Sequence, residues 1–117
     1  MMTCMLDSIR PFDVLIASVE FEDKPGVAKP RPVVVLEVDG GTLYVTAVKV
    51  TSHAPREWCS GEVVLVDWER EGLAKPSVAR CSKIMRLQTD SIRACIGTLT
   101  PRDRGAIMSG LEDAGAL

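Results

Sequence analysis

The sequence RPVVVLEV at residues 31–38 decides the fold, because three consecutive valines stand at its centre. β-branched residues favour strands, and an apolar run without alternation predicts a strand that is buried on both faces. Asp39, Gly40 and Gly41 follow directly and predict a hairpin turn. Residues 42–51 are rich in apolar and β-branched side chains and predict a long partner strand.

Four further strands and one helical turn are predicted on either side of this hairpin. The strands are expected at residues 12–19, 61–68, 77–87 and 94–99, and the turn at residues 89–91. Residues 20–30 contain Pro25, Gly26 and Pro30 and are expected to be a structureless loop. Because no crossover helices separate the early strands, we predict a small, curled, mostly antiparallel sheet or barrel.

One helix is predicted at the C-terminal end of the sequence. Thr100 suits the N-cap, Pro101 suits the first helical position, and Asp103 places negative charge at the positive end of the helix dipole. Apolar residues follow at helical spacing, and Gly115 suits the C-terminal cap. The predicted fold is therefore mostly β, an antiparallel barrel with a C-terminal α-helix.

Composition and length fit one globular domain spanning residues 1–117, with 46% hydrophobic and 26% charged residues. The apolar runs are far shorter than the roughly 18 residues that a membrane-spanning helix needs. The N-terminal residues lack the features of a signal peptide, so we expect a cytoplasmic protein. Four cysteines without a CxxC pair and a single histidine spell out no metal site and no disulfide framework.

The net charge of −2 removes the simplest electrostatic argument for a nucleic-acid-binding protein, but the charges are unevenly distributed. Residues 75–104 hold seven basic side chains against two acidic ones, whereas residues 62–71 hold four acidic ones against one basic one. Either the folded chain presents a basic groove to a polyanion, or the two signs interleave on a solvated surface.

Conventional catalytic motifs are absent from the sequence, so the candidates are individual polar side chains. Arg31 lies between two prolines that restrict the backbone to extended conformations, and a guanidinium held in this way suits a phosphate. Thr51 and Ser52 end the predicted third strand, and His53 follows them with an ordinary pKa suited to proton transfer. The alternatives are a surface arginine, hydroxyls that cap a turn, and an incidental loop histidine.

The order of these segments resembles the MazF/PemK family of toxin endoribonucleases from toxin–antitoxin modules, over nearly the whole chain. The resemblance rests on the Arg-Pro-Val strand start, the Thr-Ser pair at 51–52, Gly-Leu-x-Lys-Pro-Ser-Val at 72–78 and Ile-Gly-x-Leu at 96–99. The chain departs from the family pattern at Phe12, where a glycine usually precedes the first-strand aspartate.

The resemblance implies a dimeric SH3-like barrel of the CcdB/PemK type that cleaves single-stranded RNA without a metal or another cofactor. A cognate antitoxin is expected to occupy the RNA groove with an acidic segment. The family assigns cleavage to the residues that match Arg31 and Thr51, with Ser52 nearby, through attack of the 2′-OH to give 2′,3′-cyclic phosphate and 5′-OH ends. His53 is a separate hypothesis for the general base, since an arginine pKa above 12 makes Arg31 a poor proton acceptor.

The RNA-binding residues are expected among sparse aromatic side chains and the basic residues, namely Phe21, Lys24, Lys29, Trp58, Lys75, Arg80, Lys83 and Arg86. The alternative is a non-catalytic binding module on the same barrel, resembling gyrase poisons or a regulatory interaction domain. The chain ends in Gly-Ala-Leu instead of the Trp-Gly-Ile of gyrase poisons, and it has both Arg31 and Thr51. Both observations favour the endoribonuclease.

Overall fold

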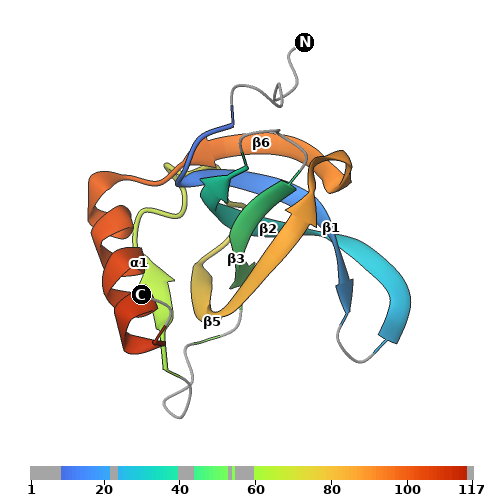
Figure 1. The fold of residues 1–117 in the computed structure, drawn as a ribbon. Coiled ribbons are helices and arrows are strands. Elements are labelled where there is room, and N and C mark those ends of the chain that lie inside the picture. The colour runs from blue at the N-terminus through green and yellow to red at the C-terminus, as the bar shows by residue number, and fades with distance from the viewer. Residues whose placement is uncertain (1–8, 22–23, 40–43, 53, 55–59, 116–117) are drawn as a thin grey trace.

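The computed structural model describes residues 9–21, 24–39, 44–52, 54 and 60–115, without the side chains of Phe21, Lys24 and Pro25. These residues form six strands, a single 3-10 turn and a C-terminal helix (Figure 1). The elements are β1 (Asp13–Phe21), β2 (Lys24–Val38), β3 (Tyr44–Thr51), β4 (Glu62–Leu65), β5 (Ser77–Gln88), η2 (Thr89–Ser91), β6 (Ile92–Thr98) and α1 (Pro101–Asp113).

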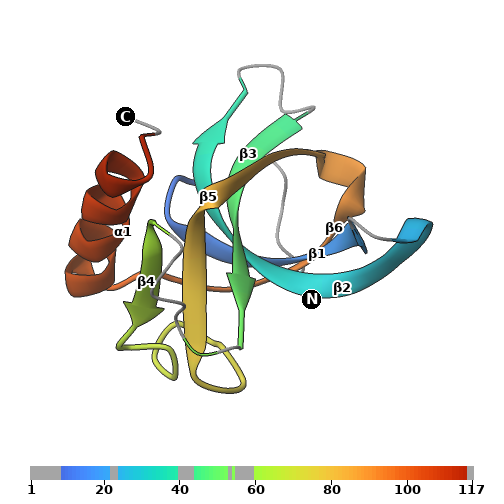
Figure 2. The same ribbon diagram turned by 90° about the horizontal axis from the view of Figure 1, so that it is seen from below.

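All neighbouring strands pair antiparallel, in the order β4-β5-β3-β2-β1-β6. Figure 2 shows these strands curled around an open ring, with α1 beside β4. Among the described strands, the edge strands β4 and β6 are not paired with each other, so the barrel stays open. The predicted fold class, an antiparallel β-barrel with a C-terminal helix, is confirmed apart from this missing closure.

The three valines of the deciding stretch are buried on both faces of the sheet, as predicted. Val33, Val34 and Val35 are each fully buried. Val34 packs in the cluster that α1 covers, which also contains Val14, Val48, Leu65, Ile107 and Leu111. Val33 and Val35 pack in a second cluster with Leu15, Ala17, Val45 and Ala47. Burying one such side chain stabilises the fold by roughly 1.5–3 kcal/mol, and β2 contributes such residues to both cores.

The loop predicted at residues 20–30 is wrong, because β2 already begins at Lys24. Its first half pairs with β1, with Val19 opposite Lys29 and Ser18 opposite Pro30. Pairing between β2 and β3 starts only at Val33, so the first half of β2 lies at a sheet edge. A proline, which has no N–H to donate, is tolerated at such an edge.

The ends of several strands also differ from the predictions. β4 ends at Leu65 instead of residue 68, because the next two backbone N–H groups donate to the Asp103 carboxylate. β6 begins at Ile92, two residues before its predicted start. Of the predicted hairpin turn, Gly40 and Gly41 lie outside the described residues, and Asp39 N–H donates to Tyr44 O at 3.1 Å.

The start of the first strand shows how this chain accommodates Phe12. Phe12 has a positive φ of 72°, a conformation that glycine adopts most easily. Its N–H donates to Val35 O at 2.6 Å, and its carbonyl accepts from Leu99 N at 2.9 Å. These bonds to β2 and to the end of β6 hold the strained residue in place, and β1 begins at Asp13.

The helix begins as predicted, since Thr100 is the N-cap and accepts from Asp103 N at 3.4 Å, with Pro101 at the first position. The C-cap is Ala114, and Gly115 follows it with a positive φ of 76°. Among the described residues, no helix has the length and apolarity needed to cross a membrane. Cys81 and Cys95 are free thiols, and the other two cysteines lie outside the described residues.

Candidate functional site

The pairing register of β2 and β3 brings Arg31 and Thr51 together. Val33 is opposite Lys49, and continuing the same register by two residues places Arg31 level with Thr51. Opposed residues of an antiparallel pair project to the same face of a sheet. Arg31 is also held from its other side, since it is opposite Ala17 of β1.

A β-bulge at Leu36 decides which hydroxyl lies level with Arg31. On the hairpin side of the bulge Glu37 is opposite Thr46, and beyond it Val35 is opposite Ala47. Without this one-residue shift, the hairpin register would place Arg31 level with Ser52. The bulge therefore selects Thr51, and not Ser52, as the residue level with Arg31 in the continued register.

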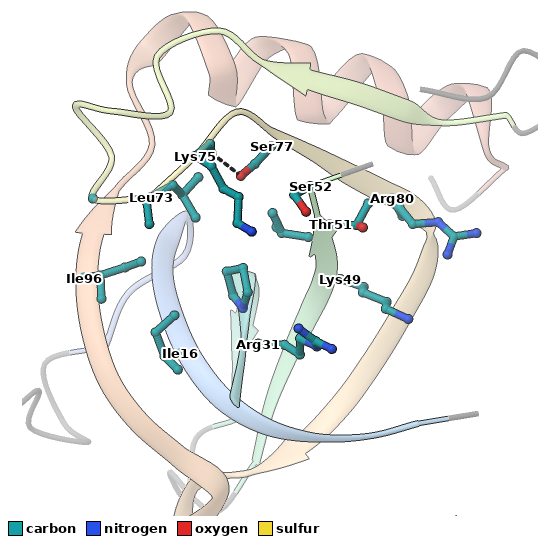
Figure 3. A pocket seen from close by; sticks show the side chains of 14 residues that line it. Ile16, Arg31, Lys49, Thr51, Ser52, Leu73, Lys75, Ser77, Arg80 and Ile96 are labelled. Carbon is teal, nitrogen blue, oxygen red and sulfur yellow. Dashed lines mark hydrogen bonds between the residues drawn. The ribbon is translucent and has the colours of Figure 1, made fainter. Parts of the chain in front are cut away.

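Arg31 and Thr51 line one cavity of about 590 Å³, which we name the cationic pocket (Figure 3). Its polar lining comprises Arg31, Lys49, Thr51, Ser52, Lys75 and Arg80, and Ser77 lies beside them. Its apolar lining comprises Ile16, Pro32, Val50, Leu73 and Ile96. Among the described residues no acidic side chain lines this pocket, so its potential favours an anion.

One wall of the pocket is the segment at residues 72–75, which crosses β6 at very short range. A Cβ atom on Gly72 would lie 2.0 Å from Ile96 O, and one on Gly97 would lie 2.3 Å from Glu71 O. Gly72 also has a positive φ of 88°. Both glycines are needed for this contact, which brings the 72–78 and 96–99 motifs together and fixes the backbone that carries Lys75.

Three carboxylates secure the other end of this wall, and we name Asp67, Glu71 and Asp103 the carboxylate anchor. Asp103 is completely buried and accepts Val66 N–H at 3.1 Å and Asp67 N–H at 3.0 Å. Glu71, also completely buried, accepts Thr100 N–H at 2.9 Å, and Asp67 accepts the Thr100 hydroxyl at 2.6 Å. These bonds join the turn after β4 to the first turn of α1.

Burial raises the pKa of Glu71 to about 7, with a further contribution from Asp103, although the Thr100 N–H opposes the shift. Among the described residues, Glu71 Oε1 is a buried oxygen without a hydrogen-bond partner. The three carboxylates have oxygens within 4.8 Å of one another, as a metal site would require. Because four of those oxygens already accept hydrogen bonds, the donor set fits a structural anchor better than a metal site.

The predicted site residues separate into groups in the structure. Arg31, Thr51, Ser52, Lys75 and Arg80 share the cationic pocket, where Arg80 is paired with Glu62 at 3.1 Å. Lys83 lines a second cavity, and Lys29 is exposed on the outer part of β2. Arg86 pairs with Asp39 at 2.5 Å and lies over the Tyr44 ring, and this pairing raises its pKa further. His53, Trp58 and the side chains of Phe21 and Lys24 lie outside what the structure describes.

Sequence reasoning missed Lys49 and the apolar lining of the pocket. Lys49 precedes Thr51 by two residues in β3, so the period of a strand already places both on one face. That two-residue spacing is the sequence signal that identifies Lys49 as a site residue. Ile16 and Ile96 carry no comparable signal, because they reach the pocket only through the curl of the sheet.

Comparison with known proteins gives one family and several similar structures. Residues 10–114 match the family described as PemK-like, MazF-like toxin of type II toxin–antitoxin system. The Mycobacterium tuberculosis toxin MazF-mt6 is 25% identical, with a TM-score of 0.69 over 90% of this chain and 97% of that one.

Two further structures show similarity of the fold alone. A mycobacterial endoribonuclease in complex with its cognate antitoxin is 17% identical, with a TM-score of 0.68 over 94% of this chain and 97% of that one. Another mycobacterial endoribonuclease is 14% identical, with a TM-score of 0.67 over 92% of each chain. No curated protein sequence matches significantly.

Proposed function

The chain belongs to the family of PemK-like and MazF-like toxins of type II toxin–antitoxin systems, and on this premise we propose that it is an endoribonuclease that cleaves single-stranded RNA in the cationic pocket. One observation carries the proposal. Arg31 and Thr51 line the same pocket, and continuing the β2–β3 register beyond Val33 and Lys49 places these two residues level with each other. A fixed arginine beside a hydroxyl donor is the pair that a reacting phosphate requires.

The shape of the pocket favours RNA that is single-stranded. Its rim is cationic and its lining includes Ile16, Leu73 and Ile96, so it offers a phosphate site next to an apolar surface (Figure 3). An unpaired nucleotide places its phosphate at such a rim and its base against the apolar lining, whereas the bases of a duplex are stacked and paired. The cavity of about 590 Å³ has room for this arrangement.

In the proposed reaction the RNA 2′-OH attacks the adjacent phosphate, the O2′–P bond forms, and the bond from phosphorus to the 5′-oxygen breaks. Arg31 donates two hydrogen bonds to the phosphate as negative charge builds on its oxygens, and Thr51 donates one more. The products are a 2′,3′-cyclic phosphate and a 5′-OH end. Since Arg31 and Lys75 supply the positive charge, the reaction is proposed to proceed without a metal ion.

Two proton transfers complete the reaction. In this proposal Arg31 passes a proton to the leaving 5′-oxygen, and the 2′-OH loses one to a general base. His53 is our hypothesis for that base. We expect His53→Ala to lower the cleavage rate and to remove a limb near pH 6.5 from the pH-rate profile, measured at saturating RNA. An unchanged profile would exclude His53.

We also propose the partners of this chain. One structurally similar endoribonuclease was solved with its cognate antitoxin. We propose that a cognate antitoxin restrains this chain too, by placing an acidic segment against Arg31 and Lys75 in the pocket, and that the toxin acts as a homodimer in the cytoplasm. If the antitoxin binds in this way, we expect an acidic peptide to compete with RNA for binding to the pocket.

The test is incubation of the purified protein with a long single-stranded RNA in excess EDTA, followed by mapping of the new ends. We expect sequence-selective cuts with 5′-OH ends, and a loss of at least about 1000-fold in Arg31→Ala. Arg102→Ala, on an exposed face of α1, is the matched control and should cut normally. Intact RNA with folded, antitoxin-free protein would favour the non-catalytic binding module instead.

A further inference from the structure

A second cavity of about 290 Å³ adjoins the cationic pocket and is lined by residues of three strands. Val19 and Glu20 come from the end of β1, Lys49 from β3, and Lys83, Ile84, Met85 and Leu87 from β5. Lys49 lines both cavities, so the two cavities adjoin at this side chain. A ligand that occupies the cationic pocket can extend past Lys49 into the second cavity.

The second cavity exists because β5 leaves its register beside Lys49. Lys49 is opposite Arg80, whereas the preceding Val48 is opposite Ile84, so residues 81–83 bulge out of the ladder. This bulge carries Lys83 to the cavity and leaves Ile84 42% exposed. Bulges that redirect side chains in this way are common next to binding sites.

The chemistry of the second cavity combines apolar walls with two charged groups. Val19, Ile84, Met85 and Leu87 offer apolar contact, Glu20 offers hydrogen-bond acceptors, and Lys83 offers donors. A nucleobase has the matching features, because its faces are apolar and its edge carries both donors and acceptors. Guanine uses these groups best, since adjacent N1–H and N2–H donors match a carboxylate and its O6 and N7 acceptors match an ammonium.

Lys49 supplies the connection between the two cavities. It is half-buried, and its ammonium group has no hydrogen bond or ion pair with any side chain that the structure describes. Two neighbouring nucleotides are joined by a phosphate, which is the group that an ammonium between two cavities would bind.

We propose that the second cavity is a guanine-binding subsite for the nucleotide next to the scissile phosphate, with Glu20 reading the base and Lys49 holding the linking phosphate. The proposal rests on the proposed function, because the cationic pocket must hold the scissile phosphate. Glu20 is then a specificity residue, and Lys49 binds RNA of any sequence.

The test uses a set of single-stranded RNAs that carry each of the four bases at every position near the cut. We expect the wild-type protein to prefer guanine at one fixed neighbouring position, and Glu20→Gln to lose about tenfold in kcat/KM on those substrates alone. Lys49→Met should weaken cleavage of all substrates equally. It should also make the RNA-binding constant less dependent on salt, reducing the steepness of log K against log salt by about 0.7. Glu112→Gln, exposed on α1, is the control for loss of one carboxylate.

Binding of 2′-O-methyl oligonucleotides, which have no attacking hydroxyl, separates this proposal from the proposed function. A guanine preference in binding that Glu20→Gln loses would support the subsite even if the wild-type protein cuts no RNA. Cleavage of RNA by both proteins with the same base preferences would overturn the subsite and leave the endoribonuclease standing. Wild-type protein that neither binds nor cuts would overturn both.

Discussion

The carboxylate anchor and the cationic pocket lie at the two ends of one short segment, residues 71–75. The anchor contains buried charged side chains, whereas the pocket contains exposed ones. In the anchor, Glu71 and Asp103 are completely buried, and three of their four carboxylate oxygens accept hydrogen bonds from backbone N–H groups. In the pocket, Arg31 and Lys75 are exposed and face a cavity that no described acidic side chain lines.

This difference suggests that the anchor carboxylates serve the structure and that the pocket cations serve the function. A buried charge is costly unless it is hydrogen-bonded, so the anchor carboxylates are expected to determine how the turn after β4 joins α1. An exposed cation costs little and attracts a polyanion, so the pocket cations are expected to act on RNA. Substitutions in the anchor should therefore change stability first, and substitutions in the pocket should change cleavage first.

Arg31→Lys is the strongest test of the pocket side of this comparison. The variant keeps the charge but loses the planar pair of donors, so we expect kcat/KM to fall about 1000-fold, or about 4 kcal/mol. The melting temperature should hardly change, because Arg31 is exposed. Cleavage of a short RNA and thermal unfolding of the same sample measure both quantities. Wild-type activity in the lysine variant would mean that charge alone suffices.

Glu71→Gln tests the anchor through the pH dependence of stability. The folded-state pKa of Glu71 is about 7, above its ordinary value of 4.5, so the folded state binds more protons than the unfolded state between these values. The contribution of Glu71 to the free energy of unfolding is therefore fully present below pH 4.5. This contribution, about 3 kcal/mol, is lost as the pH rises to about 7.

The variant removes this titration, so its stability should change less over the same range. Urea unfolding at pH 5 and pH 8 measures the difference between the two proteins. Parallel pH profiles would show that Glu71 does not carry the raised pKa.

Asp103→Asn tests how the anchor holds the wall of the pocket. An amide has one acceptor oxygen, so either Val66 N–H or Asp67 N–H faces an NH₂ group and loses its part-buried hydrogen bond. We expect a loss of about 2 kcal/mol in the free energy of unfolding. Asp113→Asn, exposed at the end of α1, is the control. A normal melting temperature in Asp103→Asn would show that the turn after β4 is held by other contacts.

The sequence is informative about this fold wherever the cause of a structure is local. The valine run predicts burial on both faces, and Thr100 with Pro101 predicts the start of α1, because each signal lies within a few residues of its effect. The extension of β2 to Lys24 depends on long-range pairing. The residues before Val33 pair with β1 on one side, and β3 leaves their other side unpaired. No property of residues 20–30 alone reports this.

The candidate site depends on registers that the sequence does not specify. Arg31 and Thr51 are both evident as candidates, but the bulge at Leu36 decides that they lie level. The acidic excess at residues 62–71 is equally evident, yet the burial of Glu71 follows from contact with Thr100 and Gly97, which are more than 25 residues away. Long-range packing therefore decides which charges are buried and which face the cationic pocket.

Lys75→Gln is expected to have the smallest effect. It tests whether the anchor and the pocket, at the two ends of residues 71–75, act independently. Lys75 is exposed and its ammonium group reaches over the pocket, so we expect KM for RNA to rise about threefold with kcat unchanged (Figure 3). The salt dependence of binding should become weaker by about one phosphate contact. Lys75 follows the anchor by four residues, so unchanged unfolding in urea is the second expectation. A destabilised Lys75→Gln would show that the wall and its cation form one structural unit with the anchor, and that stability and RNA binding cannot be altered separately in this segment.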